Sequence, residues 1–156
     1  VDDLESALDA VLRTNYYWDE RKKPNTIVLT PTGDGYAITF CPRVQGREVL
    51  DRVRGIYYNL VRKRKYEARF GIAVGPNFLF LDLNDTINVI GWGITLARRI
   101  MDEAEPNQIL CSDSFATPLK YDVPELREVR RKIQVKWQKE RITVFNYKKD
   151  QFGIKA

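Results

Sequence analysis

The spacing of hydrophobic residues changes several times along this chain, and each change marks a different kind of element. Apolar residues recur every three or four positions in three stretches, which is the period of a helix with one buried face. Helices are therefore expected over residues 4–12, 46–60 and 94–104. Short runs rich in β-branched and aromatic residues predict strands. These strands are expected over residues 26–30, 36–40, 68–74, 78–83, 87–90, 108–111, 129–137 and 141–147.

The residues between the predicted strands indicate how they are joined. The turn residues 31–35, 84–86 and 138–140 each separate two strand patterns, which predicts three hairpins. The order helix, strand, strand, helix, strand is that of a split β-α-β core without its first strand. We therefore expect an α+β fold, an α/β sandwich with a ferredoxin-like or palm-type split βαβ core. No linker rich in proline or glycine divides the chain, so residues 1–147 are predicted to form one domain and residues 148–156 a tail.

The composition narrows the possible chemistry. The 156 residues include no histidine, and the two cysteines, Cys41 and Cys111, lie far apart. This excludes Cys/His zinc sites and catalysis by a histidine base. Both cysteines are expected to be buried, reduced thiols. No apolar run approaches the roughly 20 residues of a membrane span, and no signal peptide is visible, so a cytoplasmic location is expected.

The chain carries a net charge of +5, with an excess of lysine and arginine in three short runs at 21–23, 62–65 and 130–132. Such runs can bind nucleic acid or anionic lipid, or can be a solvated surface. The solvated surface is the favoured interpretation. A nucleic-acid-binding domain is the weaker alternative, because the sequence has neither the aromatic pattern of an RNA-recognition sheet nor a helix-turn-helix pattern.

Three motifs occur in order along the chain. They are the Gly-Asp-Gly turn with its following strand (residues 30–40), Arg-Phe-Gly-Ile-Ala-Val-Gly-Pro (69–76), and the stretch from Asn88-Val89-Ile90-Gly91 to Ile109-Leu110-Cys111-Ser112. Together they resemble the class III adenylate/guanylate (nucleotidyl) cyclase homology domain, in a divergent bacterial branch. The resemblance extends from about residue 4 to residue 147.

The resemblance implies a function and a cofactor. Enzymes of this family cyclise a nucleoside triphosphate to a 3′,5′-cyclic nucleotide and release pyrophosphate, with Mg²⁺ or Mn²⁺ held by two aspartates. Their active site forms between two protomers, so the resemblance implies a homodimer. The strand that carries the first metal aspartate has no match in this chain, and we expect an upstream segment, and additional domains, in the full-length protein.

Seven residues take positions that matter in the family. The resemblance implies that Asp34 binds metal, that Gly33 and Gly35 contact the nucleotide, and that Arg99 offsets phosphate charge. Thr95 occupies the position of the ribose-orienting asparagine, while Thr30 lies near the position of the base-reading lysine and Asn88 near the second base-reading position, where asparagine says little about which base is bound. Each has a simpler interpretation: Gly-Asp-Gly is also good turn chemistry, and Arg99 could be a solvated helix residue. Trp92, in the turn before the third helix, is expected to pack rather than to cover a base.

The positions that depart from the family pattern, Thr95 and Thr30, leave two hypotheses open. The first is a divergent, Mg²⁺-dependent cyclase, and the second is a catalytically inactive module that dimerises, regulates or senses a nucleotide. Losing one transition-state contact typically costs about 10²–10³ in rate. Because the substitutions fall on catalytic positions while the fold positions persist, the second hypothesis is favoured by a small margin.

Overall fold

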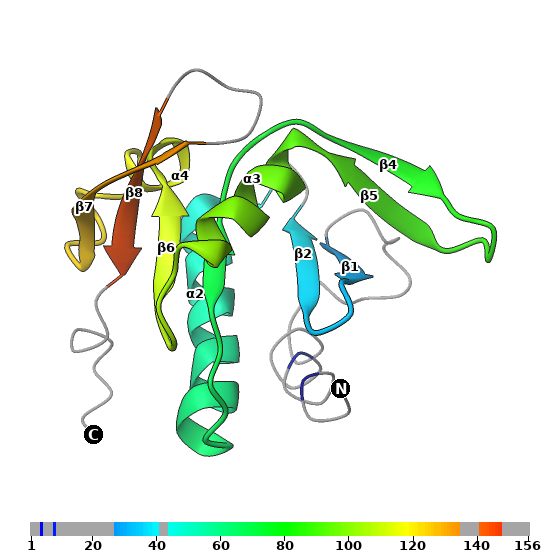
Figure 1. Ribbon diagram of the computed structural model, residues 1–156, viewed down its shortest axis with the longest axis horizontal. Helices are drawn as coiled ribbons and strands as arrows, with labels where there is room; N and C mark the ends of the chain where they lie inside the picture. Colours follow the sequence, from blue (N-terminus) through cyan, green and yellow to red (C-terminus); the bar gives the residue numbers. More distant parts are fainter. Residues whose placement is uncertain (1–3, 5–7, 9–26, 41–43, 135–140, 148–156) are drawn as a thin grey trace. The chain divides into compact units, whose positions relative to one another are not determined.

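A computed structural model describes residues 4, 8, 27–40, 44–134 and 141–147 of the chain, with side chains described up to residue 128 (Figure 1). The chain divides into two compact units, each of which combines separate segments. The first unit comprises Val1–Tyr66 and Asn77–Ile90, and the second comprises Glu67–Pro76 and Gly91–Ala156.

The first unit contains the predicted hairpin around the Gly-Asp-Gly turn. Strands β1 (Ile27–Pro31) and β2 (Tyr36–Phe40) are antiparallel. The Thr32 N–H donates to the Gly35 carbonyl at 3.0 Å, which closes the turn. Gly33 has a φ of 93°, a conformation that side chains with a Cβ rarely adopt. The backbone conformation by itself therefore favours glycine at this position, apart from any contact with a ligand.

Helix α2 (Gly46–Tyr57) follows β2, and its last turns continue as a π-helix, η3 (Tyr58–Lys63). Buried residues recur at the spacing that predicted the helix: Leu50, Val53, Ile56, Tyr57, Leu60 and Val61. Arg62 and Lys63 lie in the last turn, where positive charge interacts favourably with the negative end of the helix dipole. The predicted helix over residues 46–60 is confirmed, whereas the wider winding of its end was not expected.

The third part of the first unit is the hairpin of β4 (Asn77–Leu81) and β5 (Ile87–Gly91), which form a two-stranded sheet. The Asp82 N–H donates to the Thr86 carbonyl at 3.0 Å at the base of the turn. Asp85, within the turn, has a φ of 55°, which aspartate tolerates better than most residues. This hairpin was predicted and is confirmed.

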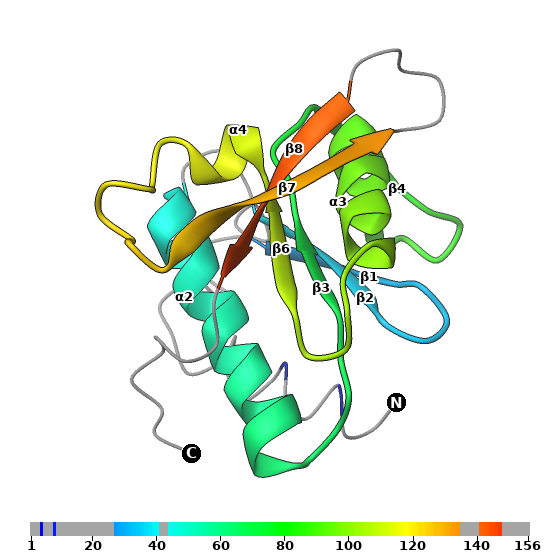
Figure 2. The same ribbon diagram turned by 60° about the vertical axis from the view of Figure 1, so that its left-hand side comes forward.

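The second unit is built on a four-stranded sheet with the strand order β3-β6-β8-β7 (Figure 2). Strand β3 (Phe70–Ile72) runs parallel to β6 (Ile109–Ser112), while β8 (Arg141–Tyr147) is antiparallel to both β6 and β7 (Leu126–Gln134). The pairing of β7 with β8 confirms the late hairpin, whose connecting residues 135–140 lie outside the described part of the chain. The strand predicted over residues 68–74 is confirmed but shorter, with three residues.

Helix α3 (Trp92–Asp102) packs on this sheet, and a glycine allows the close contact. A Cβ at Gly71 of β3 would overlap the carbonyl oxygen of Ala97 and would lie 2.5 Å from the backbone nitrogen of Met101. The core at this contact consists of Leu96, Ile100, Ala104 and Leu110, with Ala73 and Trp92 packed against it. The packing role expected for Trp92 is therefore confirmed.

A short helix that the sequence did not predict, α4 (Asp113–Ala116), follows β6. The buried Ser112 hydroxyl accepts the Phe115 N–H at 3.3 Å and caps it. Cys111, the preceding residue, is a fully buried free thiol, as expected, while Cys41 lies outside the described residues. Of the helix predicted over residues 4–12, Leu4 and Leu8 are described; both are helical and Leu8 is buried.

The mixed α/β architecture confirms the predicted fold class. Among the described residues, no helix is both long enough and apolar enough to span a membrane. The assignment of residues 1–147 to one domain stays a prediction.

Candidate functional site

The Gly-Asp-Gly turn exposes its aspartate. Asp34 lies at the tip of the β1–β2 hairpin, between Gly33 and Gly35, and its side chain is exposed to solvent. Neither neighbour has a side chain that could obstruct the carboxylate. This geometry suits a ligand that approaches from solvent, and it also suits an ordinary hairpin turn.

Thr30 lies on β1 just before this turn, paired with Ala37 of β2. Its hydroxyl oxygen is buried and has no hydrogen-bond partner among the described residues. Buried hydroxyl groups usually form a hydrogen bond, and the described residues offer no partner to this one. Thr30 is therefore a candidate for contact with a bound molecule.

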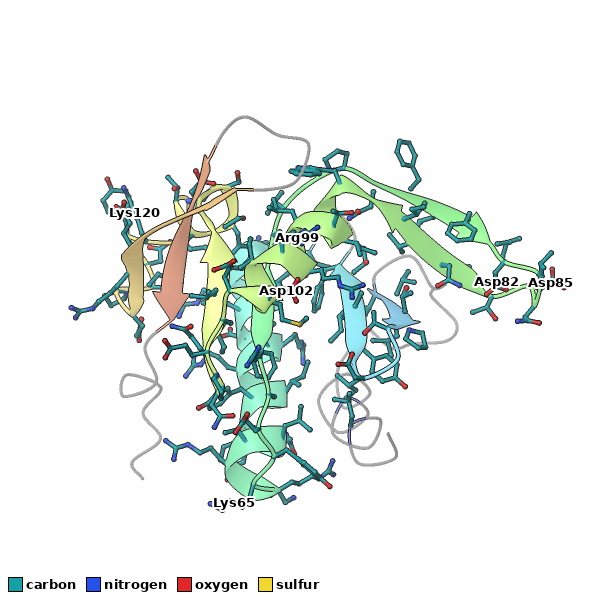
Figure 3. All side chains as sticks on the ribbon, in the orientation of Figure 1. Lys65, Asp82, Asp85, Arg99, Asp102 and Lys120 are labelled. Carbon is teal, nitrogen blue, oxygen red and sulfur yellow. The ribbon has the colours of Figure 1, made fainter. Side chains whose placement is uncertain are left out.

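Thr95 and Arg99 share one exposed face of α3. They are four residues apart, which places both side chains on the same side of a helix, and both are exposed while Leu96 and Ile100 are buried (Figure 3 labels Arg99). The Thr95 hydroxyl donates to the Gly91 carbonyl at 3.1 Å, within its own helix. In this conformation its single hydrogen is donated within the helix, and the oxygen is the part of the group that can accept a further hydrogen bond.

Asn88 lies on β5, and its side-chain amide is engaged. Its Nδ2 donates to Oδ2 of Asp82 at 2.9 Å. The same carboxylate accepts the N–H of Asn84 at 2.8 Å and of Thr86 at 3.0 Å, both at Oδ1. The pKa of Asp82 is lowered, mainly by the backbone N–H of Thr86 and then by that of Asn84; desolvation opposes this shift, and the Asn88 amide adds the smallest lowering contribution.

The sequence interpretation did not single out Asp82. The signal was present, since an aspartate that starts a turn commonly accepts the N–H groups that follow it. Figure 3 shows Asp82 and Asp85 together at the turn end of the β4–β5 hairpin.

The structure brings some of the predicted residues together. Thr30, Gly33, Asp34 and Gly35 share one hairpin, and Thr95 and Arg99 share one helix face. The hairpin and Asn88 belong to the first unit, whereas α3 belongs to the second. The roles expected for all seven residues stay predictions.

Within the described residues, no group of three or more carboxylate, cysteine or histidine side chains is gathered where it could enclose a metal ion. Asp34 is the carboxylate that the motif offers. Mg²⁺ is often bound by one or two carboxylates together with the phosphates of a nucleotide and water. The residues present therefore fit a metal ion that arrives with a triphosphate better than one held by the protein alone.

The β4–β5 hairpin carries an apolar surface that the sequence did not reveal. Five large side chains on β4 and its turn are exposed: Phe78 (70%), Leu79 (52%), Phe80 (45%), Leu81 (64%) and Leu83 (104%). We call these five residues the hairpin apolar patch. At roughly 200 Å² for a fully exposed large side chain, the patch presents on the order of 600 Å². That is at the upper end of what monomeric proteins expose.

The fold is shared with solved cyclase structures. An adenylate/guanylate cyclase/hydrolase from Silicibacter pomeroyi is 22% identical, with a TM-score of 0.63, and the match covers 94% of this chain and 85% of that one. The guanylate cyclase domain of RhGC from Catenaria anguillulae, solved with GTP, is 17% identical, with a TM-score of 0.64 and coverages of 95% and 85%. A non-canonical dimeric guanylyl cyclase domain of the RhoGC fusion protein from Blastocladiella emersonii is 17% identical, with a TM-score of 0.56 and coverages of 94% and 84%.

No protein-family profile matches the chain, and no curated protein matches it in sequence. The agreement with solved structures is therefore an agreement of fold, and it covers nearly the whole chain at low identity. The chain has the fold of the class III adenylate/guanylate cyclase catalytic domains, as its three sequence motifs predicted.

Proposed function

We propose that this domain binds a nucleoside triphosphate between two copies of itself and acts as a nucleotide sensor rather than as an efficient cyclase. One observation favours a sensor over an efficient cyclase. Thr95 stands where the family has its ribose-orienting asparagine, and the Thr95 hydroxyl hydrogen is donated to the Gly91 carbonyl. A bound ribose would therefore find an acceptor at this position, in place of an amide that can both donate and accept.

Arg99 supports the binding part of the proposal. It is exposed on the same face of α3 as Thr95, where a triphosphate could reach its guanidinium. Arginine suits this role because its planar set of N–H groups can bind two phosphate oxygens at once. The net charge of +5 favours the approach of an anionic ligand.

Asp34 would contribute to holding Mg²⁺ or Mn²⁺, together with phosphate oxygens of the nucleotide. The exposed turn gives its carboxylate free access. A bound divalent ion supplies charge neutralisation of the phosphates. With the carboxylate of Asp34 as the one ligand offered by the motif, we expect metal and nucleotide to bind together, each weakly without the other.

The hairpin apolar patch supports the dimer. Stable interfaces bury roughly 800 Å² on each partner, and the patch alone presents a large part of that area. Asp82 and Asp85 lie at the same hairpin and make an anionic membrane or a nucleic acid a poor partner. A second copy of the chain is the occupant that we propose.

A nucleotide-binding domain with a reduced Cys111 also fits a cytoplasmic location.

The direct test measures binding and product formation on the same protein. ATP, GTP, CTP and UTP are each added with Mg²⁺ or Mn²⁺; binding is followed by calorimetry and cyclic product by mass spectrometry. We expect binding of at least one triphosphate, dependence on the metal, and little or no cyclic product. Arg99→Ala should weaken binding by roughly ten- to hundredfold, as expected for a charged hydrogen bond.

The matched control is Arg98→Ala, which removes the same charge from the neighbouring exposed position of α3. It should change affinity only slightly. Cyclic product that disappears in Asp34→Ala would establish the alternative, a divergent cyclase. Failure of every triphosphate to bind, with the protein folded and dimeric, would leave the domain as a dimerisation module.

A further inference from the structure

The C-terminal end of the helix formed by α2 and η3 carries four consecutive cations. They are Arg62, Lys63, Arg64 and Lys65, and we call them the η3 basic run. Lys63 and Lys65 are exposed to solvent, and Figure 3 shows Lys65 at this end of the helix. Successive residues of a helix lie about a quarter of a turn apart, so the run spreads around the end of the helix.

The backbone holds the run in place. The Arg64 N–H donates to the Asn59 carbonyl at 3.2 Å. The Tyr66 N–H donates to the Leu60 carbonyl at 2.9 Å and closes the helix. Lys65 has a φ of 63°, a conformation that glycine usually supplies at the end of a helix. Lysine at this position costs strain that glycine would avoid, and it keeps a cation at the surface.

Little opposite charge lies near the run. The acidic residues within the helix are Glu48 and Asp51, and Asp51 precedes the run by roughly 15 Å of helix. That separation is longer than the Debye length of about 8 Å at physiological ionic strength. Glu67, which follows the run by two positions, offsets at most one of its charges. Lys63 and Lys65 make no ion pair with any residue that the structure describes.

Two half-exposed tyrosines flank the run. Tyr58 begins η3 and Tyr66 follows Lys65, and each is 46% exposed. Tyr58 precedes Arg62 by four residues, close to one turn, which places its ring beside the first cation. The helix dipole accounts for cations in the last turn, but it does not account for exposed rings beside them. Cations for phosphates together with aromatic faces for bases are the combination that binds single-stranded nucleic acid.

The apolar face of this helix belongs to the core. Its residues are all buried: Leu50, Val53, Ile56, Leu60 and Val61. A helix that lies on a membrane needs an exposed apolar face to insert among the lipids. An acidic segment of a protein would pair with the cations but has no bases to stack on the tyrosines. A nucleic acid is the polyanion that uses both.

We propose that the η3 basic run, with Tyr58 and Tyr66, binds single-stranded nucleic acid without reading its sequence. The cations contact phosphates, and the tyrosine rings stack on bases. This surface contains none of the residues of the proposed nucleotide site, so the two can be tested separately.

The probes are fluorescein-labelled oligothymidylate and oligouridylate of about 15 nucleotides, which distinguish DNA from RNA. Binding to the full chain is measured by fluorescence anisotropy over a range of salt concentrations. Each phosphate contact on a single strand contributes about −0.7 to the slope of log K against log salt, so the four cations predict a slope of about −3. Lys63→Gln combined with Lys65→Asn should bring the slope to about −1.4. Asparagine is chosen at position 65 because it tolerates the positive φ.

The matched control is Lys120→Gln combined with Arg127→Gln. It removes the same amount of charge from two other exposed positions. Lys120 also lies beside an exposed ring, with its Nζ 5.3 Å from the centroid of Tyr121. The slope should not change. Tyr58→Ala should weaken binding by about five- to a hundredfold, whereas Tyr58→Phe keeps the ring and should bind as wild type does.

Absence of binding to both oligonucleotides at low salt overturns the inference. Equal slopes for the double variant of the run and for its control also overturn it. Binding to phosphatidylserine vesicles or to polyglutamate in place of the oligonucleotides would make the partner a membrane or an acidic protein, and the inference would be wrong. If the double variant fails to fold, Lys63→Gln alone decides, with an expected change in slope of about 0.7. Triphosphate binding is measured separately, so each of these results leaves the proposed function standing.

Discussion

At the scale of single residues, the contacts of one carboxylate lead to a pH dependence. Asp82 accepts three hydrogen bonds, from two backbone N–H groups and from Asn88. Each bond favours the ionised form, and together they lower the pKa of Asp82. Because the folded-state pKa lies below the unfolded value, the carboxylate stabilises the hairpin above the unfolded pKa. This contribution is lost as the pH falls through the lower, folded value.

We predict that the Asp82 carboxyl group titrates below the ordinary value of an aspartate. The measurement is an NMR titration of the side-chain carboxyl carbons in the native protein. In Asn88→Ala the midpoint should rise, because one of the three bonds is removed. A midpoint at or above the ordinary aspartate value in wild type would contradict the hydrogen-bond network.

The thiol of Cys111 gives a second prediction at this scale. The side chain is fully buried, and burial raises its pKa because the thiolate would lose hydration. The thiolate is the reactive form, so native Cys111 should not react with iodoacetamide near neutral pH and should react once the protein is unfolded. Peptide mass spectrometry in a Cys41→Ser background measures this. Alkylation in the native state at the rate of a free thiol would show that β6 opens.

At the scale of elements, the contact between β3 and α3 depends on a missing side chain. A Cβ at Gly71 would meet backbone atoms of Ala97 and Met101, which cannot turn aside as a flexible side chain could. Leu96 and Ile100 lie in the core at this contact, so separating the helix from the strand would also expose apolar surface.

We therefore predict that Gly71→Ala lowers the free energy of unfolding by about 1–3 kcal/mol, the usual range for overpacking. Urea denaturation measures it. Gly35→Ala is the control, because a Cβ there would make only an ordinary contact of 3.5 Å with the Thr32 hydroxyl. It should change stability by less than about 1 kcal/mol. Equal stability of Gly71→Ala and wild type would mean that α3 does not pack on β3 as described.

The types of the main elements could be predicted from local pattern, but their details could not. The period of Leu50, Val53 and Ile56 predicts α2 correctly because a helix with one buried face imposes it. The π winding of Tyr58–Lys63 and the one-turn helix Asp113–Ala116 have no comparable period. Six residues or fewer are too short for a repeat to be recognised, so these two elements were missed.

At the scale of the whole molecule, the hairpin apolar patch is the feature on which the proposed dimer depends. Four consecutive apolar residues, Phe78 to Leu81, are exposed on both faces of β4. A strand exposed in this way has a strong tendency to associate. The dimer that we propose covers the patch and would place two copies of the nucleotide-binding residues in one particle.

We predict that replacing Phe78 and Leu81 together by serine converts the dimer to a monomer at micromolar concentration. Analytical ultracentrifugation measures the mass, and circular dichroism confirms the fold. The control is Tyr121→Ser, which removes an apolar side chain that is 86% exposed outside the patch. It should leave the mass of the dimer unchanged. A wild-type protein that is monomeric at high concentration would contradict the role of the patch.

The amino-acid sequence by itself determined the order and type of most elements and, through three motifs in sequence, the cyclase fold. The elements could be predicted because periodicity and turn chemistry are local properties of a chain, whereas the cyclase fold was predicted from the resemblance of the three motifs. Only the tertiary structure decided the partners of the candidate residues. The run from Phe78 to Leu81 has the pattern of a buried strand, yet it is exposed. Thr95 donates to its own helix and Asn88 to Asp82. Exposure and hydrogen-bond partners depend on which groups meet in three dimensions, and local pattern does not specify those meetings.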